Sequence, residues 1–448
     1  MIEINDIKNK NITVLGAGIS GIGASNLANY KNANVLLSNN KKFHSNDLLN
    51  NKIKKEYNHS EKCLKSDFII ISPGISSNNN IVKKIEEENI SIISEIEFAS
   101  WFTKSPIIAI TGSNGKSTVV KLLYHIFKNK YKNVFLGGNI GVSFSMNVYK
   151  ELKNNLKKSI HILEVSSFQL ERIHTFQPYI SCILNVTEDH LDRHGNFDNY
   201  LNQKIKITKN HSKKSFIVYN KDDNNLKKIF KNKINSHPYS LKNKDRFFIK
   251  GNTIFCSKTN KEIINQEKTK LIGKHNLSNI LACLEISTLF NISIQHIVRS
   301  LIDFKPLNHR MEVVYKKDNF LIINDSKGTN LDSTKSAIKS FDKKIILLLG
   351  GFSKETINKQ KIIDTTKSKN IYKIICFGEI GENIYKILNK YKSTIYIKNF
   401  EEAIVKSIEY SLNKKSILFS PGFKSFDEFK NFEDRGNMFK KIVNKYYA

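Results

Sequence analysis

The sequence predicts an α/β protein of three domains, and three features indicate this. Its 448 residues are too many for one hydrophobic core, so about three domains are expected. Three successive stretches alternate short β-branched apolar runs with segments of helical apolar spacing. Many of the apolar runs end in glycine or polar residues, as expected of parallel strands that form a site at their carboxyl ends. We therefore predict domains over residues 1–102, 103–306 and 307–448.

The first domain opens with a predicted strand at 11–15, followed by a G-x-G-x-x-G turn at 16–21 that begins a helix. Further strands are predicted at 33–38, 68–72 and 91–96. This pattern is typical of a Rossmann-like sheet. The acidic residue that would hold the ribose of NAD is replaced by Ser38, Asn39 and Asn40, so another nucleotide-bearing ligand is favoured over NAD.

The second domain contains the most informative segment of the chain. A strand at 106–110 leads into the loop T-G-S-N-G-K-S-T at 111–118, and a helical pattern follows. Backbone N–H groups of such a loop face an anion, Lys116 reaches the outer phosphates, and Ser117 or Thr118 can hold Mg²⁺. The loop predicts that the chain binds a nucleoside triphosphate.

Further strands of this domain are predicted at 160–166, 180–186 and 215–220. Glu164 is a carboxylate inside an apolar strand, and it needs a cation there, either Mg²⁺ or a salt-bridge partner. Residues 187–195, T-E-D-H-L-D-R-H-G, follow another strand and combine two histidines with three carboxylates. They could ligate a metal, hold a phosphate or transfer protons, or they could form a solvated loop.

The third domain repeats the alternation, with strands predicted at 320–324, 344–350, 372–378, 394–398 and 416–420. A net charge of +31 raises the question of nucleic-acid binding. The lysines, however, are spread through every segment instead of forming a basic stripe, so we expect no nucleic-acid partner. Five cysteines without metal-ligand spacing, no signal peptide and no membrane-spanning apolar run predict a cytoplasmic protein without a membrane partner.

A GTPase-type switch is the rival class. Residues 192–195 read D-x-x-G and residues 220–223 read N-K-x-D, both marks of such proteins. Ile110 stands where the GTPase phosphate loop has glycine, and the D-x-x-G lies too far along the chain. We therefore disfavour a nucleotide switch.

Taken together, several long motifs resemble the Mur ligase family over the whole chain. They are the loop at 111–118, G-N-I-G at 138–141, E-V-S-S-F-Q-L-E at 164–171, N-V-T-E-D-H-L-D-R-H-G at 185–195, G-K-H-N-L-S-N at 273–279, H-R-M-E at 309–312, N-D-S-K-G-T-N at 324–330, S-P-G at 420–422 and R-G-N at 435–437. The resemblance implies a Rossmann-like domain for a UDP-sugar, a central phosphate-loop ATPase-like domain, and a Rossmann-like C-terminal domain for an amino acid.

The resemblance also implies a reaction. ATP would phosphorylate the terminal carboxylate of UDP-N-acetylmuramoyl-L-alanine, and the amine of D-glutamate would displace phosphate from the acyl phosphate, in a cytoplasmic step of peptidoglycan synthesis. A monomer is expected. A ligase of the same superfamily that adds another amino acid, including a folylpolyglutamate-type ligase, is the nearest alternative. The Ser-Pro-Gly turn at 72–74 and residues 425–429 favour D-glutamate.

Site residues are implied only where this sequence matches the family motifs. The implied catalytic residues are Lys116, His190 and Lys204, and the implied ligands of two Mg²⁺ sites are Ser117, Glu164, His190 and Lys204, the last as a carbamylated lysine. The implied ATP-binding residues are Gly112, Ser113, Asn114, Gly115, Lys116, Ser117, Thr118, Asn276, Asn279, Arg310 and Asp325. The implied substrate-binding residues are Gly16, Ile19, Ser20, Ser72, Pro73, Gly74 and Asn139 for the UDP-sugar, and Lys327, Thr329, Lys354, Ser425, Phe426 and Phe432 for D-glutamate. Ser38 and Asn39 depart from the family's acidic uracil partner.

Overall fold

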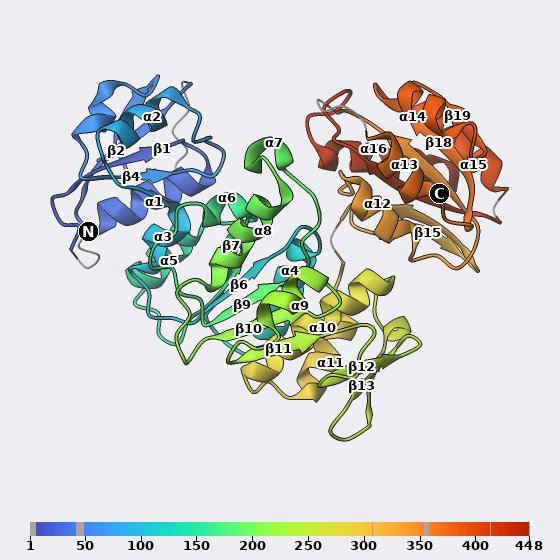
Figure 1. Cartoon of the computed structure of the whole chain (residues 1–448), viewed down its shortest axis with the longest axis horizontal. Coiled ribbons are helices and arrows are strands. Elements are labelled where there is room, and N and C mark those ends of the chain that lie inside the picture. Colours follow the sequence, from blue (N-terminus) through green and yellow to red (C-terminus); the bar gives the residue numbers. More distant parts are fainter. Residues whose placement is uncertain (1–5, 42–48, 307, 354–357, 413, 448) are drawn as a thin grey trace. The chain divides into compact units, whose positions relative to one another are not determined.

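The computed structural model describes residues 6–41, 49–306, 308–353, 358–412 and 414–447, and it confirms the predicted α/β class (Figure 1). The chain divides into two compact units. One comprises Met1–Ile263 with Ser278–Ile302, and the other comprises Ile264–Leu277 with Asp303–Ala448. The first unit contains both of the sheets predicted for the first two domains. The domain boundaries at 102 and 306 remain predictions.

The N-terminal sheet is parallel throughout, in the order β3-β2-β1-β4-β5. With β1 at its centre, it has the order of the first five strands of the Rossmann sheet, 3-2-1-4-5-6. Its strands are β1 (Asn11–Leu15), β2 (Asn34–Asn39), β3 (Lys54–Tyr57), β4 (Phe68–Ile71) and β5 (Ile92–Ser94), and its helices are α1 (Ile19–Tyr30), α2 (Asn80–Glu87) and α3 (Glu95–Ser100).

The central sheet is also parallel, in the order β11-β10-β9-β6-β8-β7. Strand β6 lies between β8 and β9, so the loop after β6 opens at the point where the chain direction across the sheet changes, which is where such sheets bind ligands. Its strands are β6 (Ile107–Thr111), β7 (Val134–Gly138), β8 (Ile160–Glu164), β9 (Ile180–Ile183), β10 (Phe216–Asn220) and β11 (Ser236–Tyr239). The helices along this part of the chain are α4 (Lys116–Lys128), α5 (Phe144–Lys153), α6 (Ser167–Leu170), α7 (Leu191–His194), α8 (Phe197–Ile205), α9 (Asn224–Phe230), α10 (Lys274–Leu289) and α11 (Ile294–Asp303).

A small sheet that was not predicted follows the central strands in sequence. It has the order β12-β13-β14, and β12 (Phe247–Lys250) pairs antiparallel with β13 (Thr253–Cys256) across a turn at Gly251, whose φ is +60°. The third strand, β14, covers Glu262–Asn265.

The C-terminal sheet has the order β15-β16-β20-β17-β18-β19. Strand β15 is an antiparallel edge, and all other neighbouring strands of this sheet pair in parallel. Helices lie along the sheet, consistent with apolar strands that are buried on both faces. The strands are β15 (Glu312–Lys317), β16 (Phe320–Asn324), β17 (Ile345–Gly350), β18 (Ile371–Phe377), β19 (Thr394–Tyr396) and β20 (Ser416–Gly422), and the helices are α12 (Leu331–Ile338), α13 (Lys359–Thr366), α14 (Gly381–Leu388), α15 (Phe400–Ser411) and α16 (Phe432–Tyr447).

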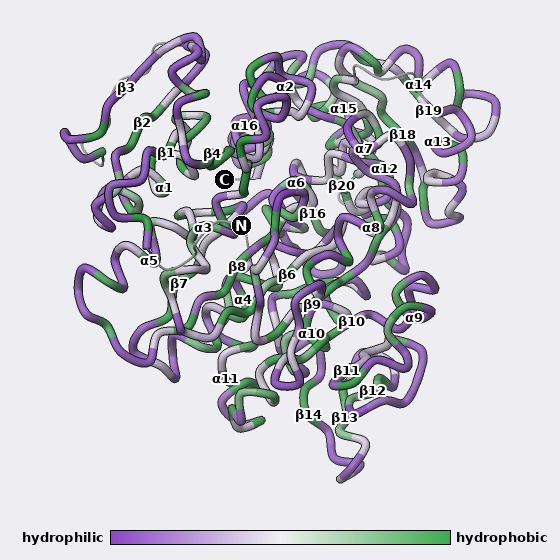
Figure 2. Tube along the Cα trace, turned by 60° about the vertical axis from the view of Figure 1, so that its left-hand side comes forward, coloured by the Kyte–Doolittle hydropathy of each residue, from purple (hydrophilic) through white to green (hydrophobic). Residues whose placement is uncertain are grey.

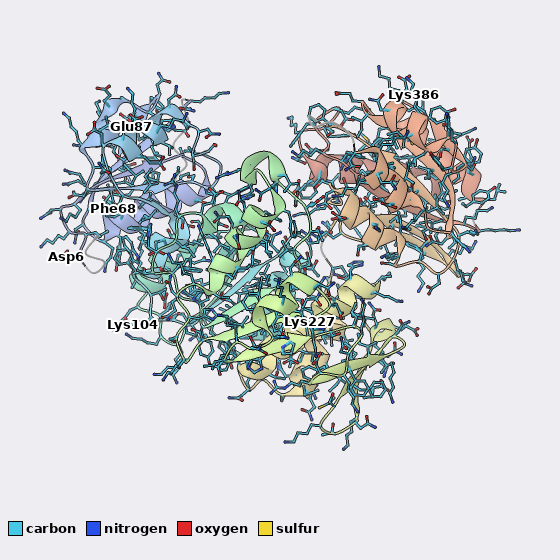
Figure 3. The ribbon with its side chains drawn as sticks, viewed as in Figure 1. Asp6, Phe68, Glu87, Lys104, Lys227 and Lys386 are labelled. Carbon is cyan, nitrogen blue, oxygen red and sulfur yellow. The ribbon has the colours of Figure 1, made fainter. Side chains whose placement is uncertain are left out.

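Hydrophobic stretches follow the strands, and hydrophilic stretches follow loops and outer helix faces (Figure 2). Phe68 is buried in the N-terminal sheet, whereas Lys104, Lys227 and Lys386 are exposed on separate parts of the chain (Figure 3). Among the described residues, no helix combines the length and apolar character needed to cross a bilayer.

Candidate functional site

The predicted phosphate loop, residues 111–118, has the backbone of an anion cradle. It follows β6, and α4 begins at Lys116 directly after it. Gly112 and Gly115 have φ values of +146° and +88°, which side-chain-bearing residues rarely adopt. A Cβ on Gly115 would also lie 2.6 Å from Asn279 Oδ1. The loop N–H groups and the helix N-terminus can therefore face a phosphate.

Lys116 lies folded over this loop. Its Nζ donates hydrogen bonds to the carbonyl oxygens of Gly112, at 2.6 Å, and Ser113, at 2.9 Å. An ammonium held above the cradle is placed to meet phosphate oxygens. The structure has the predicted order of strand, loop and helix here, and the role of Lys116 at the phosphates stays a prediction.

The loop is also held from outside by a residue whose role was not predicted. Asn185, just after β9, accepts from Asn114 N at 2.8 Å and donates to Asn114 O at 3.0 Å. Ser113 Oγ bonds to the backbone of Thr187 as both donor, at 2.9 Å, and acceptor, at 3.0 Å. Because these bonds fix the loop without a ligand, the cradle is preorganised.

Ser117 and Glu164, predicted to share Mg²⁺, lie together. Ser117 Oγ donates to Glu164 Oε2 at 2.6 Å, and Asn139 Nδ2 donates to Glu164 Oε1 at 2.9 Å. Glu164 is buried, with 3% of its surface exposed. A hydroxyl and a carboxylate are hard oxygen donors, and Mg²⁺ typically takes one or two carboxylates with phosphate oxygens and water. The pair fits such an ion by its donor chemistry. The described residues contain no cluster of three or more His, Cys, Asp or Glu side chains.

Lys204 lies beneath the same loop. It is 1% exposed, its Nζ donates to Gly112 O at 3.0 Å, and Nζ stands 4.5 Å from the centre of the Tyr200 ring. Burial, followed by the nearby charge of Lys116, lowers the pKa of Lys204 well below its usual value, although Asp189 and Glu164 act in the opposite direction. An uncharged amine is therefore more accessible here than on a surface lysine.

His190 stands at the start of α7 in the left-handed region, with φ +55°. Its ring centre is 5.0 Å from that of Phe168, its Nε2 is 3.8 Å from Asp189 Oδ2, and its side chain is 47% exposed. His194 is instead buried, and its Nε2 hydrogen-bonds Ser167 Oγ at 3.0 Å. The two histidines of the motif therefore differ, and His190 is the one open to a ligand.

The UDP-sugar residues of the N-terminal domain gather at one edge of its sheet. Leu15 and Ile71 are register partners in β1 and β4, which brings the turns after them together. Ser72 Oγ donates to Gly16 O at 3.3 Å, and a Cβ on Gly16 would lie 2.8 Å from Ser72 Oγ. The other predicted members are at the same strand ends, with Ile19 and Ser20 opening α1 and Pro73 and Gly74 following β4. Ile19 is 67% exposed, which is compatible with a ligand contact.

A carboxylate, Glu56 of β3, lies beside Ser38 at the end of β2. Ser38 Oγ donates to Glu56 Oε1 at 2.8 Å and lies 2.8 Å from His59 Nδ1. Burial acts to raise the pKa of Glu56, but hydrogen bonds from Ser60, Ser38 and Cys63 outweigh it and lower that pKa. All three side chains of this Ser38–Glu56–His59 cluster are buried. Glu56 was not predicted because β3 reads K-K-E-Y, with no apolar alternation.

In the C-terminal unit, Asp325 lies at the end of β16. Its carboxylate accepts from Ser420 Oγ at 2.7 Å and from Met311 N at 3.2 Å. Burial raises the pKa of Asp325 to about 6, against those hydrogen bonds and the charge of Arg310. Arg310 is thus near Asp325, as expected if both serve one ligand. Asn276 belongs to this unit, whereas Asn279, one turn further along α10, belongs to the first unit.

The residues predicted for D-glutamate are only partly brought together. Lys327 Nζ lies 4.6 Å from the centre of the Phe432 ring, and Thr329 N bonds to Lys327 O at 2.9 Å. Ser425 is buried, whereas Phe426 is 61% exposed and so is not a core residue. Lys354 lies outside the described residues.

Arg435, quoted in a motif but given no predicted role, organises this region. It is fully buried and donates to Ser326 O at 2.9 Å, Phe423 O at 3.1 Å and Lys424 O at 3.0 Å. Burial lowers the pKa of Arg435 to about 10, with Asp427 opposing. The guanidinium thereby holds the loop before Ser425 against the turn after Asp325.

Residues 220–223, which read N-K-x-D, make hydrogen bonds and an ion pair within the fold. Asp223 caps α9 and accepts from Val186 N at 2.8 Å, and Lys221 Nζ donates to Asp245 at 2.7 Å. Asp222 accepts from Ser240 Oγ at 2.6 Å. These contacts explain the residues of the N-K-x-D pattern by the fold alone, without a guanine pocket.

Comparison with known proteins agrees with this geometry. Residues 110–287 match the Mur ligase middle domain, and residues 309–423 match the Mur ligase, glutamate ligase domain. A UDP-N-acetylmuramoylalanine–D-glutamate ligase of Christiangramia forsetii is 35% identical over 97% of this chain and 99% of its own length. The protein of that name from Buchnera aphidicola is 39% identical, covering 97% of both chains.

Solved structures show the same fold at lower identity. A pseudomurein peptide ligase type C from Methanothermus fervidus gives a TM-score of 0.63 at 18% identity, covering 98% of this chain and 100% of its own. MurF ligase from Thermotoga maritima in complex with ADP gives 0.62 at 17% identity, covering 100% and 98%. From its sequence relatives, supported by its fold, the chain belongs to the Mur ligase family.

Proposed function

We propose that this protein is an ATP-dependent ligase that joins D-glutamate to UDP-N-acetylmuramoyl-L-alanine. The observation that carries the proposal is the 111–118 loop beside the Ser117–Glu164 pair, which suits a Mg²⁺-bound triphosphate. The choice of D-glutamate as the amino acid and of UDP-N-acetylmuramoyl-L-alanine as the sugar nucleotide rests on the names of relatives that match over nearly their full length.

The reaction needs a carboxylate to become reactive toward an amine. Attack of the substrate carboxylate oxygen on the γ-phosphorus forms a new P–O bond and breaks the β–γ bridge, releasing ADP. The amine nitrogen of D-glutamate then attacks the acyl carbon, the C–N bond forms, the amine loses a proton, and inorganic phosphate leaves. Lys116 and the loop N–H groups stabilise charge on the transferring phosphoryl group.

Two Mg²⁺ ions are proposed. Ser117 and Glu164 hold the first, which supplies charge neutralisation at the phosphates. His190 and carbamylated Lys204 would hold the second, which would supply further positive charge for the phosphoryl transfer. The lowered pKa of Lys204 supports the carbamate, because only an uncharged amine adds CO₂, and the adduct turns a cation into an oxygen donor.

We propose the remaining binding roles in the same way. Gly112 to Thr118, Asn276, Asn279, Arg310 and Asp325 bind ATP; Gly16, Ile19, Ser20, the 72–74 turn and Asn139 bind the UDP-sugar; and Lys327, Thr329, Ser425, Phe426 and Phe432 bind D-glutamate, with Lys354 proposed from sequence alone. Lys327 offers a cation to a carboxylate of the amino acid. We also propose a cytoplasmic monomer. Its ATP requirement and five unpaired cysteines support that compartment.

A phosphate-release assay with ATP, Mg²⁺ and UDP-N-acetylmuramoyl-L-alanine tests the function. We expect release with D-glutamate and little with L-glutamate, L-alanine or a diamino acid. Release with another amino acid would establish a different ligase of the superfamily. Release that needs no amino acid, or that prefers GTP, would support a nucleotide switch.

A further inference from the structure

Arg193 connects two regions of the first unit that are far apart in sequence. Its Nη1 donates to Pro73 O at 2.8 Å, in the turn after β4, and its Nη2 donates to Glu171 Oε2 at 2.9 Å, after α6. Its guanidinium carbon also lies 4.0 Å from the centre of the Phe168 ring. One side chain thus combines a backbone hydrogen bond, an ion pair and a stacking contact.

Two of these partners, Pro73 and Phe168, belong to or contact the two candidate sites, the 72–74 turn and the His190 loop. Pro73 is in the middle of the 72–74 turn, and Phe168 contacts the rings of both His190, at 5.0 Å, and His194, at 5.3 Å. Arg193 itself is three residues after His190, in the short helix α7. The turn, the guanidinium and the His190 loop therefore form one continuous set of contacts.

The backbone of His190 has an unfavourable conformation that the contacts of Arg193 can stabilise. A histidine at φ +55° costs energy, so the surrounding contacts must hold it there. Arg193 and Glu171 are each about one-fifth exposed, at 20% and 19%, so their hydrogen bonds are largely shielded from water. Lysine would keep the charge, but it cannot donate in two fixed directions and stack on Phe168 at the same time.

We propose that Arg193 is a positioning residue that couples the 72–74 turn to the His190 loop. When the sugar nucleotide occupies the turn, Pro73 O is fixed, Arg193 is fixed with it, and the His190 loop is held in the geometry that its ligand needs. This inference rests on the proposed function for the identity of the sugar nucleotide.

Arg172 provides a matched control. It also bridges the N-terminal and central regions of this unit, through Nη2 to Glu86 Oε1 at 2.6 Å and to Ser77 Oγ at 3.2 Å, and it is 19% exposed. Its side-chain hydrogen bonds go to neither the 72–74 turn nor α7, although it lines the same small pocket as Pro73 and Arg193. A loss shared by both arginine variants would therefore report only general attachment of the two regions.

The test is hydrogen exchange of the full-length protein with and without UDP-N-acetylmuramoyl-L-alanine, in wild type, R193A, R193K and R172A. We expect the sugar nucleotide to slow exchange over 188–196 in wild type and R172A but not in R193A, with partial slowing in R193K. Steady-state assays should show R193A raising the KM for the sugar nucleotide and the Mg²⁺ requirement by about tenfold, the loss expected for one hydrogen bond to a charged group. The KM for ATP should change little.

Equal effects of R193A and R172A, or unchanged exchange over 188–196 in wild type that binds the nucleotide, would overturn the coupling and leave the proposed function intact. Wild type that does not bind the sugar nucleotide would overturn both. If R193A does not fold, E171Q removes the charge of the partner carboxylate, and it should weaken the same exchange response.

Discussion

The carboxyl edges of the central and N-terminal sheets are built differently. At the central edge, the loop after β6 carries Gly112, Gly115 and Lys116 within one run of sequence, and its backbone is held by Asn185. At the N-terminal edge, the polar groups come from separate strands, and the carboxylate of Glu56 reaches Ser38 from β3. The first arrangement can be recognised in a sequence, whereas the second requires the fold.

The largest effect is expected from a substitution at the carboxyl edge of the central sheet. Lys116→Ala should lower kcat at least about 100-fold, because it removes a preorganised charge from the phosphoryl group in the transition state. Phosphate release with all substrates measures this. Lys128→Ala, an exposed change at the other end of α4, should leave the rate near wild type. Substantial turnover by the Lys116 variant would contradict the phosphate-loop assignment.

The next effect concerns Lys204, beneath the same loop. Removing CO₂ from the buffer should lower kcat, and added bicarbonate should restore it. Since the lowered pKa leaves more uncharged amine near neutrality, the bicarbonate response should persist there and weaken as the pH falls and the amine is protonated. Lys204→Ala should be inactive with or without bicarbonate.

Exposed Lys209→Ala is the control for this prediction, and its bicarbonate response should match that of wild type. A ¹³C NMR carbamate signal present in wild type and absent from the Lys204 variant would identify the adduct. Full activity of the Lys204 variant would contradict its role.

A smaller effect is expected at the N-terminal edge. The two carboxylate oxygens of Glu56 accept hydrogen bonds from Ser38 and Ser60. In Glu56→Gln an NH₂ group, which donates hydrogen bonds, takes the place of one of these oxygens. The KM for the sugar nucleotide should rise by about three- to tenfold, the size of one weakened hydrogen-bonded contact, while the KM for ATP stays constant. Glu88→Gln, exposed after α2, is the matched control. An equal rise in both KM values would mean that the cluster acts only on stability.

The last prediction concerns stability at the contact between the N-terminal and central regions of the first unit. Glu95, at the start of α3, accepts from Ser145 N in α5 at 2.5 Å, and burial raises its pKa to about 7. A carboxyl whose pKa is higher in the folded state stabilises that state while protonated. Its contribution is complete below the unfolded value of 4.5 and is lost as the pH rises through about 7.

Chemical denaturation of wild type and Glu95→Gln between these pH values measures the loss. The wild-type free energy of unfolding should fall relative to the variant as the pH rises, because glutamine remains neutral. Exposed Glu87→Gln should follow wild type. Parallel curves for wild type and Glu95→Gln would show that Glu95 ionises without cost to the fold.

The sequence predicted those parts of the molecule whose information is local. Strands such as β6, β8 and β17 are apolar runs, and the structure has them within two residues of the predicted bounds. The loop at 111–118 was predicted because glycines, lysine and a helix start are consecutive.

The unpredicted parts depend on contacts between distant residues. Strand β3 is mostly polar and pairs only at the edge of its sheet. Asn185 and Arg435 act through hydrogen bonds to backbone atoms, and no residue type elsewhere in the sequence marks those partners. Glu56 lies beside Ser38 because the two are register partners in β2 and β3, which only the strand pairing reveals.

The buried guanidinium of Arg435 has a consequence for how the protein is made. It comes from α16, downstream of every described strand of its sheet, yet it secures the loop that carries Ser425. A growing polypeptide can pair β17 with β18 before this helix has been made, but the loop at 423–425 then lacks its anchor. The loop that carries Ser425 is therefore completed only after α16 has been made, long after the 111–118 loop and its strands.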